Sequence, residues 1–190
     1  MRPDRRQVIA RAALHVLATA GARGLTHRAV DAAVGLPTGS TSYYFRSRLA
    51  LLKACVTELV DQDHADLDVM HPLATSRDEA MLAKALGDVL YRWLSTDRQR
   101  HLARYELSME AVRRPDLARV LHHGGVAIRE RIAGVLAGLG ASDPVEQAYW
   151  LVACIDGILF DRIAGANAGA VVDRAEIDRI SRRLASVAVR

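Results

Sequence analysis

The sequence predicts an all-α protein of about nine helices, and three observations lead to that fold class. Apolar residues recur at the spacing of a helix face along almost the whole chain, as between Val8 and Ala20. No segment shows the strict alternation of apolar and polar residues that is typical of a half-buried strand. At four points a residue that favours helix starts is followed three residues later by Glu or Gln.

Four helices are expected before a connector at residues 64–75. The first three lie next to residues that favour the start or the end of a helix. Ser, Thr and Asp are favoured at helix starts, Pro in the first turn, and Gly just after the last turn. The first helix carries the apolar stripe from Val8 to Ala20 and is expected to end at Gly21. The expected boundary residues of the others are Thr26 and Gly35 for the second, Pro37 and Phe45 for the third, and Ser47 for the start of the fourth.

Five further helices are expected after the connector. Four of them open with a residue that caps the helix and a reciprocal acceptor three positions later. These pairs are Ser76 with Glu79, Thr96 with Gln99, Asp143 with Glu146, and Asp173 with Glu176. They predict helices near 77–95, 97–113, 144–165 and 174–188. Another helix is expected from Pro115 toward Leu139, with a bend at the Gly124-Gly125 pair.

Composition excludes several classes of protein. The chain has 190 residues, of which 51% are hydrophobic, and no uncharged apolar run reaches the roughly 18 residues of a membrane span. The charged N-terminus leads into an amphipathic stretch, unlike a secretory signal. With two cysteines, Cys55 and Cys154, neither a disulfide framework nor a Cys-rich zinc site is expected. We therefore expect a cytoplasmic protein with no membrane partner.

No catalytic, cofactor or metal motif is present in the sequence. The seven histidines are scattered, and no H-E-x-x-H pair, phosphate-binding loop or G-x-S-x-G nucleophile motif occurs. We expect no metal and no cofactor, and we expect that the protein is not an enzyme.

The positive charge is concentrated in the first quarter of the chain. Residues 1–50 hold eight arginines against Asp4 and Asp31, a net charge of +6, whereas the remainder holds 18 basic and 20 acidic residues, a net charge of −2. A basic end beside a nearly neutral remainder favours a polyanionic partner. On charge alone, a solvated helix face explains the pattern equally well.

Residues 26–48 hold the strongest functional signal. Two short helices joined by a glycine-containing turn form a helix-turn-helix, whose second helix enters the major groove of DNA with its N-terminal residues at base edges. The second helix begins with small hydrogen-bonding residues, and the aromatic run Tyr43-Tyr44-Phe45 follows. One alternative is that all three aromatic residues pack into a core. Because Arg46 and Arg48 lie next to them, we favour the interpretation in which the two tyrosines contact phosphates and Phe45 anchors the helix.

This segment resembles the DNA-binding motif of the TetR family of bacterial transcriptional regulators. The matching residues are Thr26, the run Ala29 to Leu36, the run Gly39 to Phe45, and Arg48 before Leu51-Leu52. Pro37 stands where the family usually has a Ser-like cap, Ser42 and Tyr44 where it more often has Tyr and His, and Leu49 where an acidic residue is common. The resemblance implies a helix-turn-helix DNA-binding domain over residues 1–47 and a helical effector-binding and dimerisation domain over 48–190.

The candidate DNA contacts come from the helix-turn-helix and the residues that flank it. They are Thr26, Arg28, Thr38, Gly39, Ser40, Thr41, Tyr43, Tyr44, Arg46 and Arg48. Thr38 or Ser40 is expected to touch base edges, whereas Tyr43 and the arginines are expected to contact phosphates.

The family resemblance also implies a homodimer and an effector cavity. Apolar seams on the last two helices agree with a dimer interface formed by Leu151, Ile155, Ile158, Leu159, Ile177, Ile180, Leu184 and Val187. Packing within one chain is the alternative for these seams. Candidate effector-binding residues, each of which core packing could also explain, are Trp93, His101, Tyr105, Met109, Trp150, Cys154 and Asp156.

The sequence therefore predicts a ligand-responsive regulator, most often a repressor in this family, that binds a palindromic double-stranded DNA operator as a homodimer and is released by a small-molecule effector. One alternative is a small helical dimer that binds a ligand, or acts as an enzyme, in its central cavity. Another is a ligand carrier or scaffold whose basic end binds a membrane surface, although such a face normally carries exposed Leu, Phe or Trp.

Overall fold

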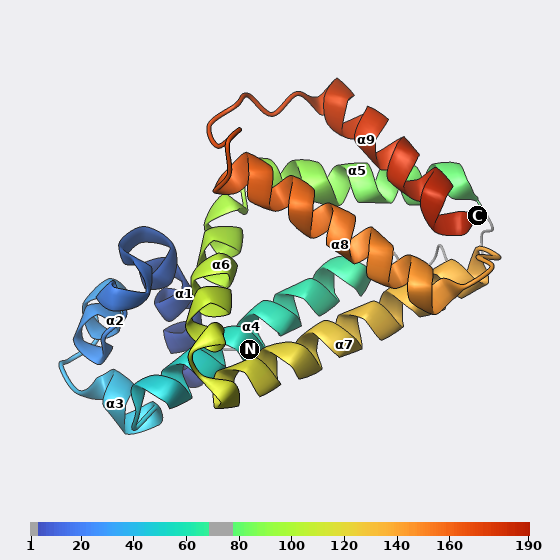
Figure 1. Cartoon of the computed structure of the whole chain (residues 1–190). Coiled ribbons are helices and arrows are strands. Elements are labelled where there is room, and N and C mark those ends of the chain that lie inside the picture. Colours follow the sequence, from blue (N-terminus) through green and yellow to red (C-terminus); the bar gives the residue numbers. More distant parts are fainter. Residues whose placement is uncertain (1–3, 69–77) are drawn as a thin grey trace. The chain divides into compact units, whose positions relative to one another are not determined.

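The computed structural model describes residues 4–68 and 78–190. Within these ranges all regular structure is α-helical (Figure 1), which confirms the predicted fold class. The helices are α1 (Arg5–Gly24), α2 (His27–Val34), α3 (Ser40–Tyr44), α4 (Arg48–Asp68), α5 (Glu79–Ser95), α6 (Arg98–Val112), α7 (Pro115–Gly138), α8 (Pro144–Ile163) and α9 (Arg174–Val189).

The chain divides into two compact units. The first holds the chain up to Gln62 together with Gln99–Gly124, and the second holds Asp63–Arg98 and Gly125–Arg190. Helices α4 and α7 each begin in the first unit and end in the second. The predicted boundary between residues 47 and 48 separates two functions and not two compact units, and it stays a prediction.

Several expected helix starts are present with their caps. The hydroxyl of Thr26 accepts a hydrogen bond from the Ala29 N–H at 3.1 Å, and that of Ser47 accepts from Ala50 at 3.1 Å. The carboxylate of Asp143 accepts from Glu146 at 3.1 Å, directly before Pro144 in the first turn of α8. Each cap satisfies a backbone N–H that has no partner inside its helix.

At α8 and α9 the cap is present but the expected reciprocal acceptor is not, and at α8 the Asp143 N–H donates to Gln147 Oε1 at 3.1 Å instead of Glu146. The carboxylate of Asp173 accepts a hydrogen bond from the Ala175 N–H at 3.0 Å. Glu176, the expected acceptor, forms an ion pair with Arg162 instead.

Other expected boundaries are wrong, because neighbouring residues take over the role. Asp78 caps α5 by accepting from Ala80 at 2.8 Å, and the expected cap Ser76 lies outside the described residues. The Thr96 hydroxyl donates to the Arg92 carbonyl at 3.1 Å, so it closes α5 and does not open α6. Pro37 precedes α3, which begins only at Ser40.

The sequence predicts a stop at Gly21 and a bend at the Gly124-Gly125 pair. The helical dihedrals of α1 break at Gly21 (φ 65°), as expected of a stop, but one more turn follows to Gly24. Helix α7 continues without interruption through Gly124 and Gly125. A Cβ at Gly124 would lie 2.4 Å from a methyl group of Val60, so this glycine permits close packing of α7 on α4 within the first unit.

Each unit has its own apolar interior. In the first unit α1, α2, α4 and α6 surround a core that includes Ile9, Leu17, Val30, Leu52 and Leu107. In the second unit α9 packs along α5 and α8, as Figure 1 shows. None of the helices in the described ranges is long and apolar enough to cross a membrane.

Candidate functional site

The turn between α2 and α3 is built by a left-handed glycine. Gly35 ends α2 with φ 68° and ψ 33°, a conformation that residues with a side chain rarely adopt. Its N–H donates to the Ala32 carbonyl at 3.2 Å, and the N–H of Leu36 donates to the Asp31 carbonyl at 2.9 Å. This pair of bonds is the Schellman arrangement that closes a helix and reverses the chain. The expected helix-turn-helix is therefore present in residues 26–45.

Asp31 fixes the start of α3 from the preceding helix. Helix α3 begins after Gly39, which has φ 96° and offers no capping side chain. The carboxylate of Asp31 supplies the missing acceptor, with Oδ2 2.8 Å from the Gly39 nitrogen and Oδ1 2.7 Å from the Thr41 nitrogen. Asp31 is only 2% exposed. Sequence analysis missed this role, although Asp31 is one of only two acidic residues among the first 50.

Hydrogen bonding keeps Asp31 ionised. Burial raises the pKa of this carboxyl, but the hydrogen bonds from Thr41 and Gly39 outweigh burial, so the pKa lies below its ordinary value. A buried carboxylate with two backbone donors forms charge-assisted bonds, which are stronger than neutral ones. The charge also lies at the N-terminus of α3, where a negative charge is favourable.

The other end of α3 is held by side chains that sequence analysis also did not single out. The His27 ring nitrogen Nε2 lies 2.6 Å from the Phe45 carbonyl oxygen. The guanidinium of Arg6 donates to the Tyr44 carbonyl at 3.0 Å and lies 4.6 Å from the centre of the Phe45 ring. Phe45 is buried in the core of the first unit, so its expected role as the anchor of α3 is confirmed.

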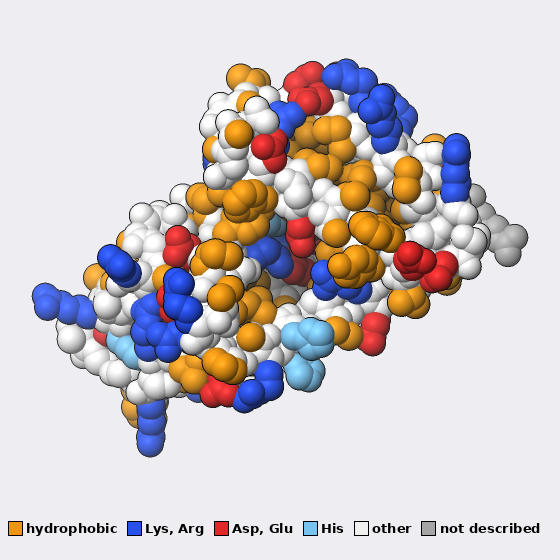
Figure 2. Space-filling view, viewed as in Figure 1, with side chains coloured by type: hydrophobic (Ala, Val, Ile, Leu, Met, Phe, Trp, Pro, Cys, Tyr) orange, Lys and Arg blue, Asp and Glu red, His pale blue; other side chains and the backbone are white. Residues whose placement is uncertain are grey.

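Most of the candidate DNA contacts remain on the surface around α3. Tyr43 is 79% exposed and meets the half-buried Tyr44 edge to face, with ring centres 5.2 Å apart. The other exposed candidates are Thr26, Arg28, Thr38, Gly39 and Arg46, and Ser40 is half-buried. The hydroxyl of Ser40 donates to the Pro37 carbonyl at 2.7 Å, which leaves its oxygen lone pairs to accept. Figure 2 shows Lys and Arg side chains projecting from this part of the molecule.

Two candidate contacts have structural roles instead. Thr41 is fully buried, so its side chain does not face solvent, and only its N–H acts, toward Asp31. The guanidinium of Arg48 donates to the carbonyls of Ala22 and Leu25 at the end of α1 and lies 3.8 Å from the Glu110 carboxylate. We therefore reassign both residues from DNA contact to support of the motif.

The second unit encloses a small apolar cavity of about 50 Å³. Its walls come from α4, α5, α7 and α8, and apart from the Trp93 ring all of them are aliphatic. They are Leu67, Leu82, Leu86, Val89, Leu90, Trp93, Ile132, Val135, Leu136, Leu151 and Ile155. Known small-molecule sites measure about 300–1,000 Å³, so this cavity is too small for a drug-sized ligand.

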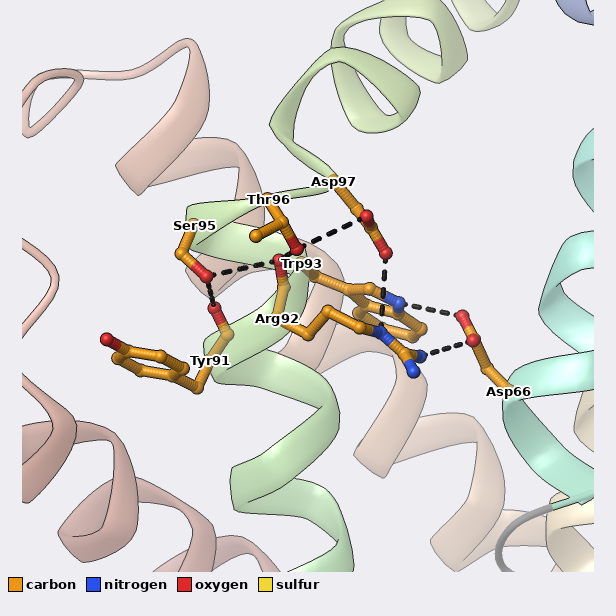
Figure 3. A network of polar contacts seen from close by, with 7 residues as sticks. All are labelled: Asp66, Tyr91, Arg92, Trp93, Ser95, Thr96 and Asp97. Atoms are coloured by element: carbon orange, nitrogen blue, oxygen red, sulfur yellow. Dashed lines mark hydrogen bonds and ion pairs between the residues drawn. The ribbon is translucent and has the colours of Figure 1, made fainter.

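Polar groups beside the cavity are paired with one another (Figure 3). The indole N–H of Trp93 donates to Asp66 Oδ2 at 2.8 Å, and Arg92 pairs with the other oxygen of Asp66. Arg92 also reaches Asp97, with 3.3 Å between Nε and the carboxylate. Trp93 therefore presents a ring whose polar edge is already satisfied.

Of the candidate effector residues, the structure brings only Trp93 to this cavity. On α8, Trp150, Cys154 and Asp156 are exposed. On α6, which belongs to the first unit at these positions, His101 is buried, Tyr105 is half-buried and Met109 is exposed. We therefore reassign Trp150, Cys154 and Asp156 from the cavity wall to the surface of α8. No set of three or more His, Cys, Asp or Glu side chains in the described residues is arranged to hold a metal ion.

The predicted dimer seams are used largely within the chain. Leu151, Ile155, Leu159 and Ile177 are buried in the second unit, where α8 and α9 pack together. This corrects their assignment to an interface, because the sequence pattern marked the inner face of each helix. Among the remaining candidates Ile158, Ile180 and Leu184 are half-buried and Val187 is 71% exposed.

The outer face of α8 carries large apolar residues that are at least half exposed. Val145 is 75% exposed, Tyr149 54%, Trp150 56% and Phe160 50%. Figure 2 shows hydrophobic side chains gathered over this helix. Contiguous exposed apolar patches of this kind mark interaction surfaces.

Comparisons with known proteins agree with this architecture. A family model described as tetracycline repressor-like, C-terminal domain, matches residues 77–187. A TetR-family member from Streptomyces coelicolor is 30% identical over 96% of this chain and 98% of its own, with a TM-score of 0.75. The multidrug binding protein EbrR, solved with ethidium, is 30% identical over 97% of this chain and 99% of its own, with a TM-score of 0.69.

A more distant structure shows the same fold at lower identity. A TetR-family regulator from Mesorhizobium loti is 17% identical over 100% of this chain and 97% of its own, with a TM-score of 0.77. No curated protein sequence matches the chain.

Proposed function

Because the chain belongs to the TetR family of transcriptional regulators, we propose that it is a ligand-responsive repressor that binds a palindromic operator as a homodimer. The observation that carries the proposal is α3, a short helix locked by Asp31 that presents Tyr43 and the residues around Ser40 to solvent. Small polar groups at the start of an exposed recognition helix suit base edges, and the flanking arginines suit phosphates. The proposal includes no catalytic step, cofactor or metal.

Homodimerisation would supply the geometry that DNA requires. Two recognition helices related by a twofold axis can read two half-sites about 34–36 Å apart. The exposed apolar face of α8, with Tyr149, Trp150 and Phe160, supports α8 as the centre of that interface. Val187 of α9, which is 71% exposed, extends the candidate surface. The buried seam residues would contribute by holding α8 and α9 in place.

Release from DNA would follow from ligand binding in the second unit. EbrR, the relative solved with ethidium, is a multidrug binding protein, which supports a ligand site in this chain as well. Helices α4 and α7 run from the first unit into the second, and both line the cavity, so a change in the cavity is passed on along continuous helices. An effector can shift the equilibrium only by its different affinities for the DNA-bound and DNA-free states.

The direct test is DNA binding on the sequence upstream of the chain's own coding region. Footprinting should reveal a palindromic protected site, and fluorescence anisotropy should give its affinity as a function of salt. Tyr43→Ala and Arg46→Ala should weaken binding, whereas Arg113→Ala, an exposed charge at the end of α6, should not. Equal binding by all four proteins would refute recognition through α3.

The dimer is tested separately by a charge placed on the exposed face of α8. Tyr149→Glu should leave the monomer folded, because residue 149 is 54% exposed, and should dissociate the dimer by placing unpaired charges in the interface. Analytical ultracentrifugation with circular dichroism separates the two properties. A folded, fully dimeric variant would exclude this face as the interface.

A further inference from the structure

From the cavity in the second unit we infer the chemical class of the effector: an uncharged, apolar molecule, not an organic cation. The inference rests on the proposed ligand response and specifies its site. The cavity combines aliphatic walls with the ring of Trp93, whose indole N–H is already bonded to Asp66.

The walls offer no partner to a charge. Leu82, Leu90, Leu136 and Leu151 on three different helices are each no more than 5% exposed, so a ligand among them is removed from water. An ionised group transferred to such a place without a partner carries a large desolvation cost. An apolar ligand gains from the same burial, because its own surface leaves water.

Asp66, the acidic residue at the edge of the cavity, is not available to a cation. Its Oδ2 accepts from the Trp93 indole at 2.8 Å, and its other oxygen pairs with Arg92. Arg92 is held in turn by Asp97 at 3.3 Å. A cationic ligand would have to displace a guanidinium that is tethered twice, whereas an uncharged ligand leaves the whole network in place (Figure 3).

Arg131, which directly precedes the wall residue Ile132 on α7, is also paired. Arg131 of α7 donates to Asp68 Oδ1 at 2.6 Å, to the His64 carbonyl at 3.1 Å, and contacts the His64 ring nitrogen at 2.8 Å. An anionic ligand would have to displace these partners of Arg131. Trp93, Asp66 and Arg92 are likewise bonded to one another, which leaves shape and apolar surface as the basis of selection.

A ligand can bind only if the cavity becomes larger, so binding of an apolar ligand changes the conformation of the second unit. About 50 Å³ is less than the 150 Å³ of a known apolar cavity that admits benzene, so side chains have to move. The walls of leucine, isoleucine and valine can change rotamer without breaking a hydrogen bond. The aromatic wall, by contrast, is held through its indole edge by Asp66.

The test uses three probes with the same alkyl chain and different head groups: 1-decanol, decyltrimethylammonium and decanoate. Trp150→Phe leaves Trp93 as the sole tryptophan reporter, since the chain has two tryptophans. Titration of this variant should shift Trp93 emission and raise the melting temperature with decanol, with a Kd about tenfold or more below that of either ion. Equal or tighter binding of decyltrimethylammonium, or no binding of any probe, overturns the inference.

A cavity-filling variant with a matched control locates the site. Ile155→Phe places a larger ring in the cavity wall, and Ile158→Phe makes the same change three residues along α8, outside the wall. The first variant should lose about tenfold in decanol affinity and the second should bind as the parent does. Calorimetric melting of both variants without ligand verifies that each is folded. If folded Ile155→Phe binds decanol as tightly as the parent does, the ligand does not bind in this cavity.

Operator binding, measured in parallel, separates this inference from the proposed function. If decanol binds the cavity but leaves DNA affinity unchanged, the ligand class stands and the ligand-responsive part of the proposed function fails. If decyltrimethylammonium binds more tightly and releases DNA, the proposed function stands and the ligand class is wrong.

Discussion

The recognition segment of the first unit and the cavity of the second unit use polar side chains in opposite ways. Around α3, charged side chains bond to the backbone of neighbouring segments, as Asp31 does to the start of α3 and Arg48 to the end of α1. In the second unit, the groups beside the cavity pair with one another, as Asp66 does with Arg92 and Trp93. The first arrangement holds the surface of α3 in place, and the second keeps polar groups out of the apolar cavity.

Helix length explains the difference. Helix α3 has five residues and α2 has eight, which is too short to be stable in water without help. Side-chain bonds to the backbone supply that help and place the recognition surface. Helices α5, α7 and α8 have 17, 24 and 20 residues and are stabilised by packing along their apolar faces. Substitutions should therefore act through different mechanisms in the two units.

The largest effect on stability is expected from the apolar interior of the second unit. Leu159 is 1% exposed, and Leu159→Ala should cost about 2–5 kcal/mol in the free energy of unfolding, because it leaves a cavity. Ile158→Ala on the same helix should cost less, since Ile158 is only half-buried. Urea denaturation measures both variants. Equal losses would contradict the assignment of Leu159 to the inner face of α8.

A smaller loss is expected when the polar lock of the first unit is opened. Asp31→Ala leaves the N–H groups of Gly39 and Thr41 without their acceptor and should cost about 1–3 kcal/mol. It should also weaken operator binding, since α3 loses its fixed start, while decanol binding in the second unit is unchanged. A variant that loses stability but keeps full DNA affinity would show that Asp31 does not position the recognition helix.

The same lock predicts a dependence on pH with a definite sign. The folded pKa of Asp31 is below its ordinary value, so the stabilisation is fully present above the unfolded pKa of about 3.9. It should be lost as pH falls from there through the folded pKa. The difference in unfolding free energy between the parent and Asp31→Asn should therefore shrink on the acid side of that value. If the difference in unfolding free energy grew toward low pH, the folded pKa of Asp31 would lie above its ordinary value and not below it.

Arg46 and Arg48 provide a comparison within the recognition segment. Arg46 is exposed, and Arg46→Ala should lower the salt slope of DNA binding by about one unit without changing stability. Arg48 is bonded to the backbone carbonyls of Ala22 and Leu25, so Arg48→Ala should destabilise the fold and leave the salt slope of the folded fraction unchanged. The opposite result would return Arg48 to the phosphate contacts.

The smallest effects concern individual groups on α3. Tyr43→Phe should lose about 1 kcal/mol on every operator variant, the size of one net hydrogen bond to a phosphate. Ser40→Ala should instead reduce discrimination at one base pair of each half-site, where a mismatch costs about 1–3 kcal/mol. Binding to a series of single-base operator variants distinguishes the two. An unchanged profile for Ser40→Ala with an altered one for Tyr43→Phe would exchange their roles.

The sequence by itself determined the helical class, the helix-turn-helix and most helix starts, because these depend on neighbours. The caps Thr26, Asp143 and Asp173 act on backbone groups two or three residues away, and the φ of Gly35 follows from the absence of a side chain. Apolar spacing likewise identified the inner faces of α8 and α9. All of these signals lie within one or two turns of the chain.

Only the tertiary structure decided what each apolar face meets and where each buried charge is used. The spacing of Leu151, Ile155 and Leu159 is the same whether the partner is another helix of the chain or a second subunit, and the fold shows that they pack internally. Asp31 acts on Gly39 and Thr41 in the next helix, and Arg48 reaches back to Ala22 and Leu25 at the end of α1. Such contacts join segments eight to 26 residues apart, a separation that no local pattern encodes.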